Sequence, residues 1–165
     1  ISDKLPNSKI KFKFYEHDSF LKQIAEAKMV ISSPGLTTAF ESFNLKTPMF
    51  FLPPQNYSQY WNLDTFSKRK IATNALNWNN IYPESNIIKN EEQLIGIKKV
   101  LSCVNSFEND EMVQQKVKDY IEKIINLNNK KLDVVINKQK KYLDSLGGNG
   151  IDEITKQIDS LMKTL

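Results

Sequence analysis

The sequence has only one cysteine and one histidine among its 165 residues, and these scarcities exclude several classes of protein. Cys103 has no second cysteine with which to form an internal disulfide, and one cysteine with one histidine is too little for a structural zinc site. Long apolar runs are also missing, because none reaches the roughly 18 residues that a membrane-spanning helix needs. The first residues show no basic-then-apolar signal pattern. We therefore expect a cytoplasmic protein that binds no metal.

The composition that remains is ordinary for a globular protein, with 40% hydrophobic and 25% charged residues. The length fits one domain, which we expect to span residues 1–165, with an α/β core over about 1–85 and a helical part over about 90–165. The net charge of +4 suits an anionic ligand or an acidic membrane surface, but the lysines are spread along the chain. Because the sequence starts with Ile1 and soon enters a strand-like segment, we expect a piece of a longer polypeptide.

Strand-like and helix-like segments alternate in the first half of the chain. Strands are predicted at 9–15, 29–33, 48–52 and 71–78, and helices at 18–28, 37–46 and 60–67, the first of them capped by Asp18. This alternation indicates βαβ units and a parallel sheet. Further helices are predicted at 91–104, 110–127, 130–146 and 151–162, with a break at 147–150. The segment 128–131 is predicted as a loop between helices, with a continuous long helix as the alternative. The predicted fold class is α/β, with a parallel sheet, flanking helices and a helical C-terminal part.

A glycine and several hydroxyl groups follow the second predicted strand and open a helix. In parallel α/β sheets, ligands bind beyond the carboxyl ends of the strands. Backbone N–H groups and the helix dipole favour a phosphate at such a position, and glycine lets the anion come close. The segment therefore predicts a diphosphate site formed by Ser33, Gly35, Leu36, Thr37 and Thr38.

Glu41 lies on the same helix, four residues after Thr37 and three after Thr38, so these side chains share one face. A carboxylate only accepts hydrogen bonds, and it can accept two from the vicinal hydroxyls of a ribose. An anion site beside this acidic residue favours a nucleotide. The alternative is a plain capping arrangement, in which a Ser or Thr cap is followed by a glutamate.

The segment from Pro53 to Asn62 is polar and aromatic and directly follows a buried strand. Amide groups suit sugar hydroxyls because they donate and accept, and aromatic rings offer an apolar face to a sugar ring. A loop with core-packed aromatics is the alternative, and it is the interpretation we favour for Tyr60 and Trp61.

These residues carry a resemblance to a known family. The string SSPGLTTAFESFNLKTPMFFLP followed by QNYSQYWN resembles the C-terminal domain of GT-B glycosyltransferases, and most closely that of MurG-type N-acetylglucosaminyltransferases. The matching positions are Gly35, Thr38, Glu41, Pro48 and the segment Gln59-Tyr60-Trp61-Asn62. Residues 15–28 resemble the loop and helix before that strand, and residues 148–158 resemble the family's closing helix. The resemblance implies a Rossmann-like fold that lacks its first strands.

The resemblance also implies roles for individual residues. Glu41 would bind the ribose, the segment from Gly35 to Thr38 would hold the diphosphate, and Gln59 would contact the donor sugar. Asn62 would support the loop or a phosphate. Backbone groups of Glu16 and His17 would meet the uracil, and the His17 ring would stack on it, unless His17 is a surface histidine beside a helix cap. Ser58 departs from the longer acidic or amide residue of many relatives, so the resemblance does not specify the sugar.

The function implied is binding of a UDP-sugar, or another nucleotide-diphosphate sugar, for transfer of the sugar to an acceptor hydroxyl. The donor is the substrate, and no metal or other cofactor is implied. Because the base and acceptor site of such enzymes come from an N-terminal domain, in cis or as a separate subunit, no catalytic residue is assigned here. Two alternatives stay open: a UDP-sugar 2-epimerase of the same fold, and a non-catalytic donor-binding subunit of a split transferase.

Two further partners are considered from the basic composition. Nucleic acid is not expected, because the aromatic residues follow apolar strand and helix patterns without an interleaved basic platform. The lysine-rich helices from Lys116 to Lys141 leave two interpretations, a peripheral contact with an anionic membrane and a solvated helix face.

Overall fold

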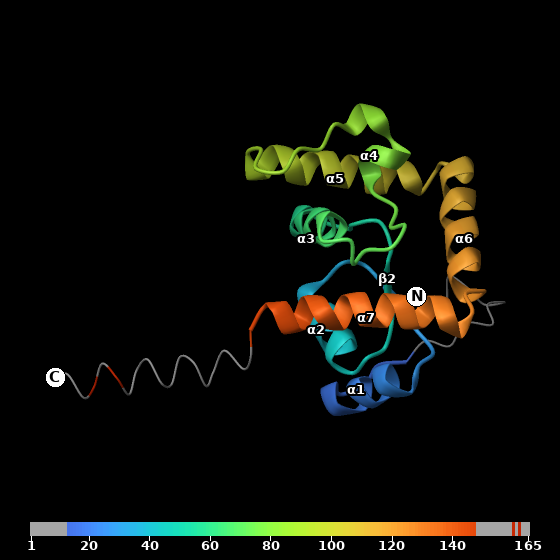
Figure 1. Cartoon of the computed structure of the whole chain (residues 1–165). Coiled ribbons are helices and arrows are strands. Elements are labelled where there is room, and N and C mark those ends of the chain that lie inside the picture. Colours follow the sequence, from blue (N-terminus) through green and yellow to red (C-terminus); the bar gives the residue numbers. More distant parts are fainter. Residues whose placement is uncertain (1–12, 148–159, 161, 163–165) are drawn as a thin grey trace.

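The computed structural model describes residues 13–147 together with Ser160 and Met162 (Figure 1). Within this part of the chain, helices surround a pair of β-strands. In chain order the elements are α1 His17–Glu26, β1 Val30–Ser32, α2 Leu36–Asn44, β2 Met49–Phe51, α3 Tyr57–Lys68, α4 Trp78–Ile81, the 3-10 helix η2 Pro83–Ser85, α5 Gln93–Phe107, α6 Glu111–Ile125 and α7 Asn129–Ser145. The described residues thus form a helix-rich α/β structure.

The strands β1 and β2 pair in parallel, with Ile31 opposite Phe50, and α2 forms the crossover between them. This arrangement confirms the predicted strands at 29–33 and 48–52 and the helix at 37–46. Successive residues of β2 enter different cores, because Met49 and Phe51 pack with residues of α2 and α3 whereas Phe50 packs with residues of α6 and α7. A strand buried on both faces needs a continuous apolar run, which explains the sequence of β2.

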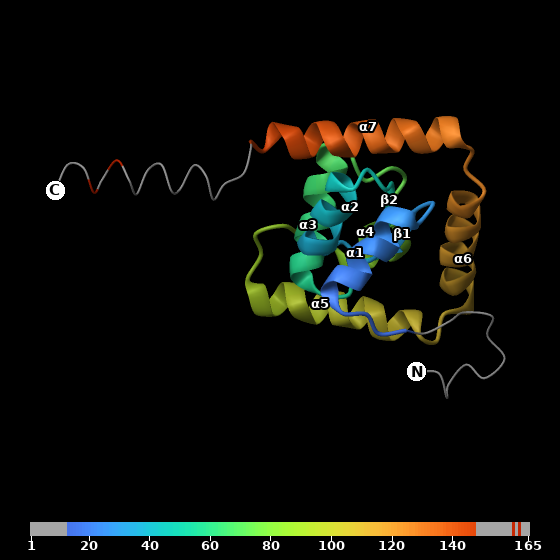
Figure 2. The ribbon, with the colours of Figure 1, turned by 90° about the horizontal axis from the view of Figure 1, so that it is seen from below.

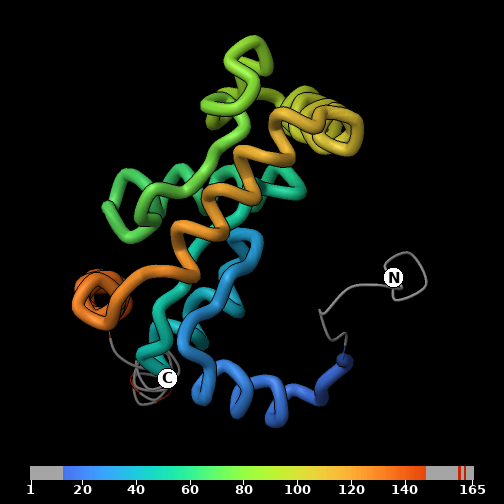
Figure 3. The backbone as a smooth tube through the Cα atoms, turned by 90° about the vertical axis from the view of Figure 1, so that its right-hand side faces the viewer, coloured from blue at the N-terminus to red at the C-terminus, as the bar shows by residue number. Residues whose placement is uncertain are grey.

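Helices α5, α6 and α7 run round three sides of the unit formed by β1, α2, β2 and α3 (Figures 1 and 2). Viewed from the side, α6 crosses from the level of α5 to the level of α7 (Figure 3). Helix α3 packs on α5, and α2 packs on α7. The buried stripe of α6 consists of Val113, Val117, Tyr120 and Ile124, as its helical spacing predicts. The predicted helical C-terminal part is therefore confirmed through α7.

The predicted strand at 71–78 is wrong. Thr73 and Asn74 form a turn, and α4 begins at Trp78. We call α5, α6 and α7 the frame helices, because they run round the unit of β1, α2, β2 and α3 (Figure 2). The outer edge of β2 is occupied instead by side chains from two of them, α6 and α7. Gln139 of α7 accepts a hydrogen bond from Met49 N (3.0 Å) and donates to Met49 O (2.7 Å), and the Tyr120 hydroxyl donates to Phe51 O (3.1 Å). Three backbone groups on this edge, Met49 N, Met49 O and Phe51 O, thus have side-chain partners in place of a third strand.

Several predictions at the N-terminus also need correction. Residues 9–12 of the predicted strand at 9–15 lie outside the described residues, and residues 13–16 have no regular structure. Helix α1 begins at His17 with Glu16 as its N-cap residue, not after a cap at Asp18. The predicted helix at 151–162, with the resemblance at 148–158, lies outside the described residues except for Ser160 and Met162. In the described helices, no segment is both long and apolar enough to cross a membrane.

Candidate functional site

The N-terminal end of α2 carries backbone donors that no side chain caps. Gly35 is the N-cap residue, and it makes no side-chain cap hydrogen bond. The plain capping arrangement of a Ser or Thr cap with Glu41 is therefore wrong. The first N–H bonded back into the helix is that of Ala39, which donates to Gly35 O at 3.2 Å. Within the described residues, the N–H groups of Leu36, Thr37 and Thr38 have no hydrogen-bond acceptor, so they remain available to an anion.

Gly35 is not explained by the fold around it. Its φ of −79° and ψ of 140° suit any residue, and a Cβ added there would meet no heavy atom within 4 Å. Gly96 on α5 is different, because an added Cβ would overlap the ring of Tyr57. The absence of a side chain at Gly35 therefore leaves open space beside the exposed donors of α2.

His17 and Glu41 lie next to each other where α1 packs on α2. His17 Nε2 is 3.7 Å from Glu41 Oε1, although the two residues are far apart in the sequence. The carboxylate of Glu41 is 18% exposed and the imidazole of His17 is 66% exposed. Glu16 is exposed, and its carbonyl accepts a hydrogen bond from Phe20 N at 2.9 Å. An imidazole thus stands at the surface over a carboxylate that is largely shielded.

The start of α3 is fixed by hydrogen bonds among its own first residues. Asn56 caps the helix, because its Oδ1 accepts from Gln59 N at 2.9 Å and from Ser58 Oγ at 2.8 Å. Gln59 Oε1 in turn accepts from Gln55 N at 2.8 Å. The Gln59 amide oxygen therefore holds the turn, and its amide nitrogen has no partner among the described residues. Asn56 was not predicted as part of the site, although an asparagine just before a helix is a recognisable cap signal.

Asn62 joins α3 to the loop before α2. Its Nδ2 donates to the carbonyl of Pro34 at 2.9 Å, and this contact spans 28 residues of sequence. The position of Gly35 and of the α2 donors beside it thus depends on an amide from α3. This geometry is consistent with the loop-supporting role that the resemblance implies for Asn62.

A cleft of about 450 Å³ lies on the other side of Asn62, between the N-terminal ends of α3 and α5. Its lining combines amides, hydroxyls and a carboxylate with aromatic and aliphatic surface. The lining residues are Asn56, Tyr57, Ser58, Trp61, Asn62, Glu91, Gln93 and Ile97. Trp61 Nε1 is buried with no hydrogen-bond partner among the described residues, and Lys89 Nζ lies 5.1 Å from the Trp61 ring centroid. Tyr60 packs in the core, as expected, with its hydroxyl bonded to Ile87 O.

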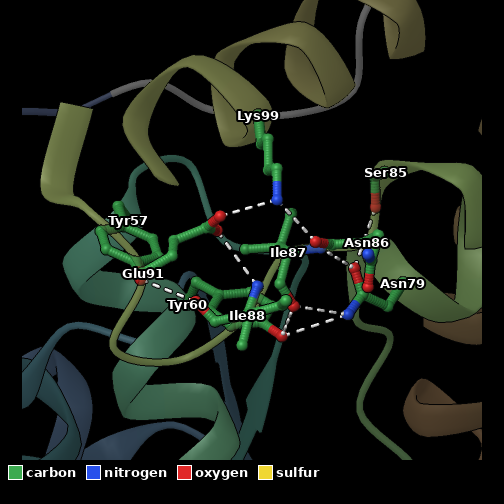
Figure 4. Close-up of polar contacts among 9 residues, drawn as sticks. All are labelled: Tyr57, Tyr60, Asn79, Ser85, Asn86, Ile87, Ile88, Glu91 and Lys99. Carbon is green, nitrogen blue, oxygen red and sulfur yellow. Dashed lines mark hydrogen bonds and ion pairs between the residues drawn. The ribbon is translucent and has the colours of Figure 1, made fainter. Parts of the chain in front are cut away.

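Glu91, which lines this cleft, ends the loop from 85 to 91, and Asn79 anchors that loop (Figure 4). Asn79 Oδ1 accepts hydrogen bonds from Ile87 N and from Ser85 Oγ, both at 2.9 Å. Asn79 Nδ2 donates to Ile87 O at 2.8 Å, and the Tyr60 hydroxyl donates to the same carbonyl at 2.8 Å. Both peptide groups of Ile87 are therefore fixed by side chains from α3 and α4.

Glu91 closes the same loop. Its Oε1 accepts from Ile88 N at 3.1 Å, its Oε2 pairs with Lys99 Nζ at 2.6 Å, and the Tyr57 hydroxyl donates to Ile88 O at 2.7 Å (Figure 4). Burial acts to raise the pKa of Glu91, but the hydrogen bonds from Lys99 and Ile88 and the charge of Lys99 outweigh it and lower the pKa. Glu91 is therefore a fixed carboxylate in the cleft, and sequence reasoning did not identify it.

The described residues also bear on two other kinds of chemistry, nucleophilic attack by a cysteine and metal binding. Burial raises the pKa of the Cys103 thiol, and the residue is 4% exposed, so Cys103 is unsuited to act as a nucleophile. Within residues 13–147, no group of three or more His, Cys, Asp or Glu side chains is placed to hold a metal ion. The arrangement as described suits binding of a polar, anionic molecule.

Comparisons of the chain with protein-family models, curated proteins and solved structures find no match. The resemblance to GT-B glycosyltransferases therefore stays a prediction from the motif residues. The functional assignment depends on the geometry around α2 and α3.

Proposed function

We propose that this chain binds a nucleoside diphosphate sugar, with the diphosphate at the N-terminal end of α2, as the donor-binding part of a GT-B glycosyltransferase. The observation that carries the proposal is the combination at Gly35 of unbonded helix donors with open space that the fold does not require. No acidic residue lies in the first turn of α2 to compete for these donors. Helix donors and the positive end of the helix dipole together favour a phosphate group.

The nucleoside part is supported by the pair formed by His17 and Glu41. A nucleotide joins a ribose directly to a base, so a site for it needs a group for the hydroxyls beside a group for the ring. Glu41 offers two acceptor oxygens to vicinal hydroxyls, and the imidazole of His17 lies 3.7 Å from one of them. Glu41 lies on α2, the helix that starts after Gly35, and His17 lies on α1, which packs on α2.

The sugar part is supported by the cleft between α3 and α5. Asn62 lines that cleft and also bonds to Pro34, so the cleft lies directly beside the proposed diphosphate position. The hydroxyl of Ser58 and the side-chain amides of Asn62 and Gln93 line this cleft and can bond sugar hydroxyls. The free amide nitrogen of Gln59 lies in the same first turn of α3 as Ser58. A volume of about 450 Å³ is sufficient for a hexose, since small-molecule sites span roughly 300–1,000 Å³.

Calorimetric titration with UDP and UDP-sugars tests the proposal. Glu41→Ala is expected to weaken UDP binding by about 1–3 kcal/mol, because the ribose hydroxyls lose their acceptors. Glu122→Ala is the matched control, since Glu122 is an exposed carboxylate on α6, and it should leave the affinity unchanged. If Glu41→Ala binds UDP as tightly as the unaltered protein while keeping its fold, the ribose assignment is wrong.

The reaction is tested separately from binding. Because the described residues offer no assigned base for an acceptor hydroxyl, we expect the chain to bind the donor without turning it over. Incubation with UDP-N-acetylglucosamine and no acceptor should return the sugar unchanged, whereas a 2-epimerase would alter its stereochemistry. A companion protein that restores transfer would support a split enzyme.

A further inference from the structure

We propose that a second cleft, at the corner between α6 and α7, binds a single-chain amphiphile with an anionic headgroup. The cleft has a volume of about 540 Å³, within the roughly 300–1,000 Å³ of small-molecule sites. Its lining residues are Phe50, Thr73, Asn74, Tyr120, Lys123, Ile124, Leu127, Asn128, Lys130, Lys131, Val134, Val135 and Lys138. None of these residues lines the cleft between α3 and α5, so the inference does not depend on the proposed nucleotide site.

The interior of this cleft is apolar. Phe50, Ile124 and Val135 belong to one buried cluster that fills the space between β2 and the two helices. Tyr120 also lines the cleft, and its hydroxyl already donates a hydrogen bond to Phe51 O. What Tyr120 can offer a ligand is therefore the apolar surface of its ring. Val134 is 50% exposed and brings apolar surface from this interior out toward solvent. An alkyl chain would bind favourably to such a surface, because its burial removes the apolar area of the chain and that of the cleft from water.

The lining also carries charge of one sign. It includes Lys123, Lys130, Lys131 and Lys138 and no carboxylate. Among the described residues, none of these four ammonium groups forms an ion pair, although Lys140 on α7 does pair, with Asp144. Four unpaired cations beside an apolar cleft are complementary to a molecule with one apolar chain and one anionic head.

The positions of Lys130 and Lys131 are not explained by the stability of α7. Both residues lie in the first turn of this 17-residue helix, and that turn contains no acidic residue. The helix dipole disfavours cations at that end. Lysines there weaken the helix slightly, and a bound anion would offset their charge. A neutral or cationic ligand would leave this arrangement unexplained.

The test measures binding of dodecyl phosphate and of the uncharged dodecyl maltoside to the full chain, both below their micelle-forming concentrations. We expect dodecyl phosphate to bind at least about tenfold more tightly, and its affinity to fall with added salt. Lys130→Gln/Lys131→Gln should lose about tenfold in dodecyl phosphate affinity. Lys116→Gln/Lys118→Gln removes the same charge from exposed positions of α6 outside the cleft, and it should bind normally.

A second variant tests the cleft itself. Val134→Asp places a carboxylate beside the apolar interior at a half-exposed position, so it should abolish binding without unfolding the protein. Met112→Asp is its control, because Met112 is 75% exposed on α6 and does not line the cleft. Equal effects of the two double lysine variants would overturn the proposal. Binding only to phosphatidylserine vesicles, with none to soluble dodecyl phosphate, would also overturn it, since a charged surface alone would explain that result.

Discussion

Gly35 and Gly96 are both glycines at helices, but only Gly96 has a neighbour that requires the absence of a side chain. The ring of Tyr57 occupies the space where a Cβ at Gly96 would lie, whereas the corresponding space at Gly35 is open. Packing therefore accounts for Gly96. Our proposal explains Gly35, whose backbone angles suit any residue, by the close approach of a phosphate.

The two alanine variants are expected to separate stability from binding. Gly35→Ala should change the free energy of unfolding by less than about 1 kcal/mol, because a poorer N-cap residue and a less flexible unfolded chain oppose each other. It should nevertheless weaken UDP binding, since the added methyl group stands beside the α2 donors. Gly96→Ala should destabilise the protein by about 1–3 kcal/mol through overpacking.

Thermal unfolding and calorimetric titration measure the two effects. Gly96→Ala serves as the control for the binding experiment. The molecules of this variant that are folded should bind UDP with the affinity of the unaltered protein. A Gly35→Ala protein that binds UDP normally would remove the main support for the diphosphate position.

At the scale of elements, loop 85–91 is held mainly by side chains from α3, α4 and α5. Asn79 and Tyr60 fix Ile87, and Lys99 fixes both Glu91 and Asn86. Glu91 also lines the cleft beside α3, so its pairing with Lys99 fixes one part of the cleft lining. Because the carboxylate of Glu91 is only 11% exposed, its pairing with Lys99 is weakly screened by solvent.

The stability contributed by Glu91 is expected to depend on pH. Its pKa is lowered in the folded protein from an ordinary value of 4.5, so folding favours the charged form. This contribution is complete above pH 4.5 and is lost as the pH falls through the folded-state pKa. Glu91→Gln should cost about 1 kcal/mol at neutral pH, and its melting temperature should fall less on acidification than that of the unaltered protein.

Melting curves from neutral pH down to about pH 3 measure this dependence, since that interval covers the ordinary carboxyl pKa. Glu122→Gln is the control, because the exposed carboxylate on α6 forms no ion pair among the described residues. Parallel curves for Glu91→Gln and the unaltered protein would contradict the proposed role of the Lys99 pair.

At the scale of the whole molecule, Gln139 connects the frame helices to the sheet. It is 1% exposed, and it bonds Met49 N and Met49 O across 90 residues of sequence. Its Nε2 also lies 3.4 Å from Ile71 O. One amide thereby satisfies an edge of β2 that a strand would otherwise occupy.

Replacing Gln139 is therefore expected to be costly. Gln139→Leu should lower the free energy of unfolding by about 2–4 kcal/mol, because both peptide groups of Met49 lose their partners in a buried position. Asn137→Leu on the same helix should have little effect, since Asn137 is exposed. Denaturant titration compares the two.

Gln139→Glu gives a more selective test. A carboxylate can accept from Met49 N but cannot donate to Met49 O, whereas a protonated carboxyl group can do both. This variant should therefore be least stable, relative to the unaltered protein, at neutral pH and recover on mild acidification. A loss of stability that does not change with pH would argue against the donated hydrogen bond.

The sequence by itself determined the local features of this protein. Periodic apolar residues and turn residues predicted β1, β2, α2 and the frame helices, because helix and strand spacing depends on near neighbours in the chain. Spacing along one helix also placed Thr38 and Glu41 on a common face. Asn56 could have been found in the same way.

Only the tertiary structure decided how these parts meet. It brought His17 to Glu41 and Asn62 to Pro34, and it made both clefts from residues distant in sequence. It also replaced the predicted strand at 71–78 with the side chain of Gln139 at the edge of β2. A polar residue on a helix carries no local sign that it will be buried, because its partner is chosen by packing across the whole chain.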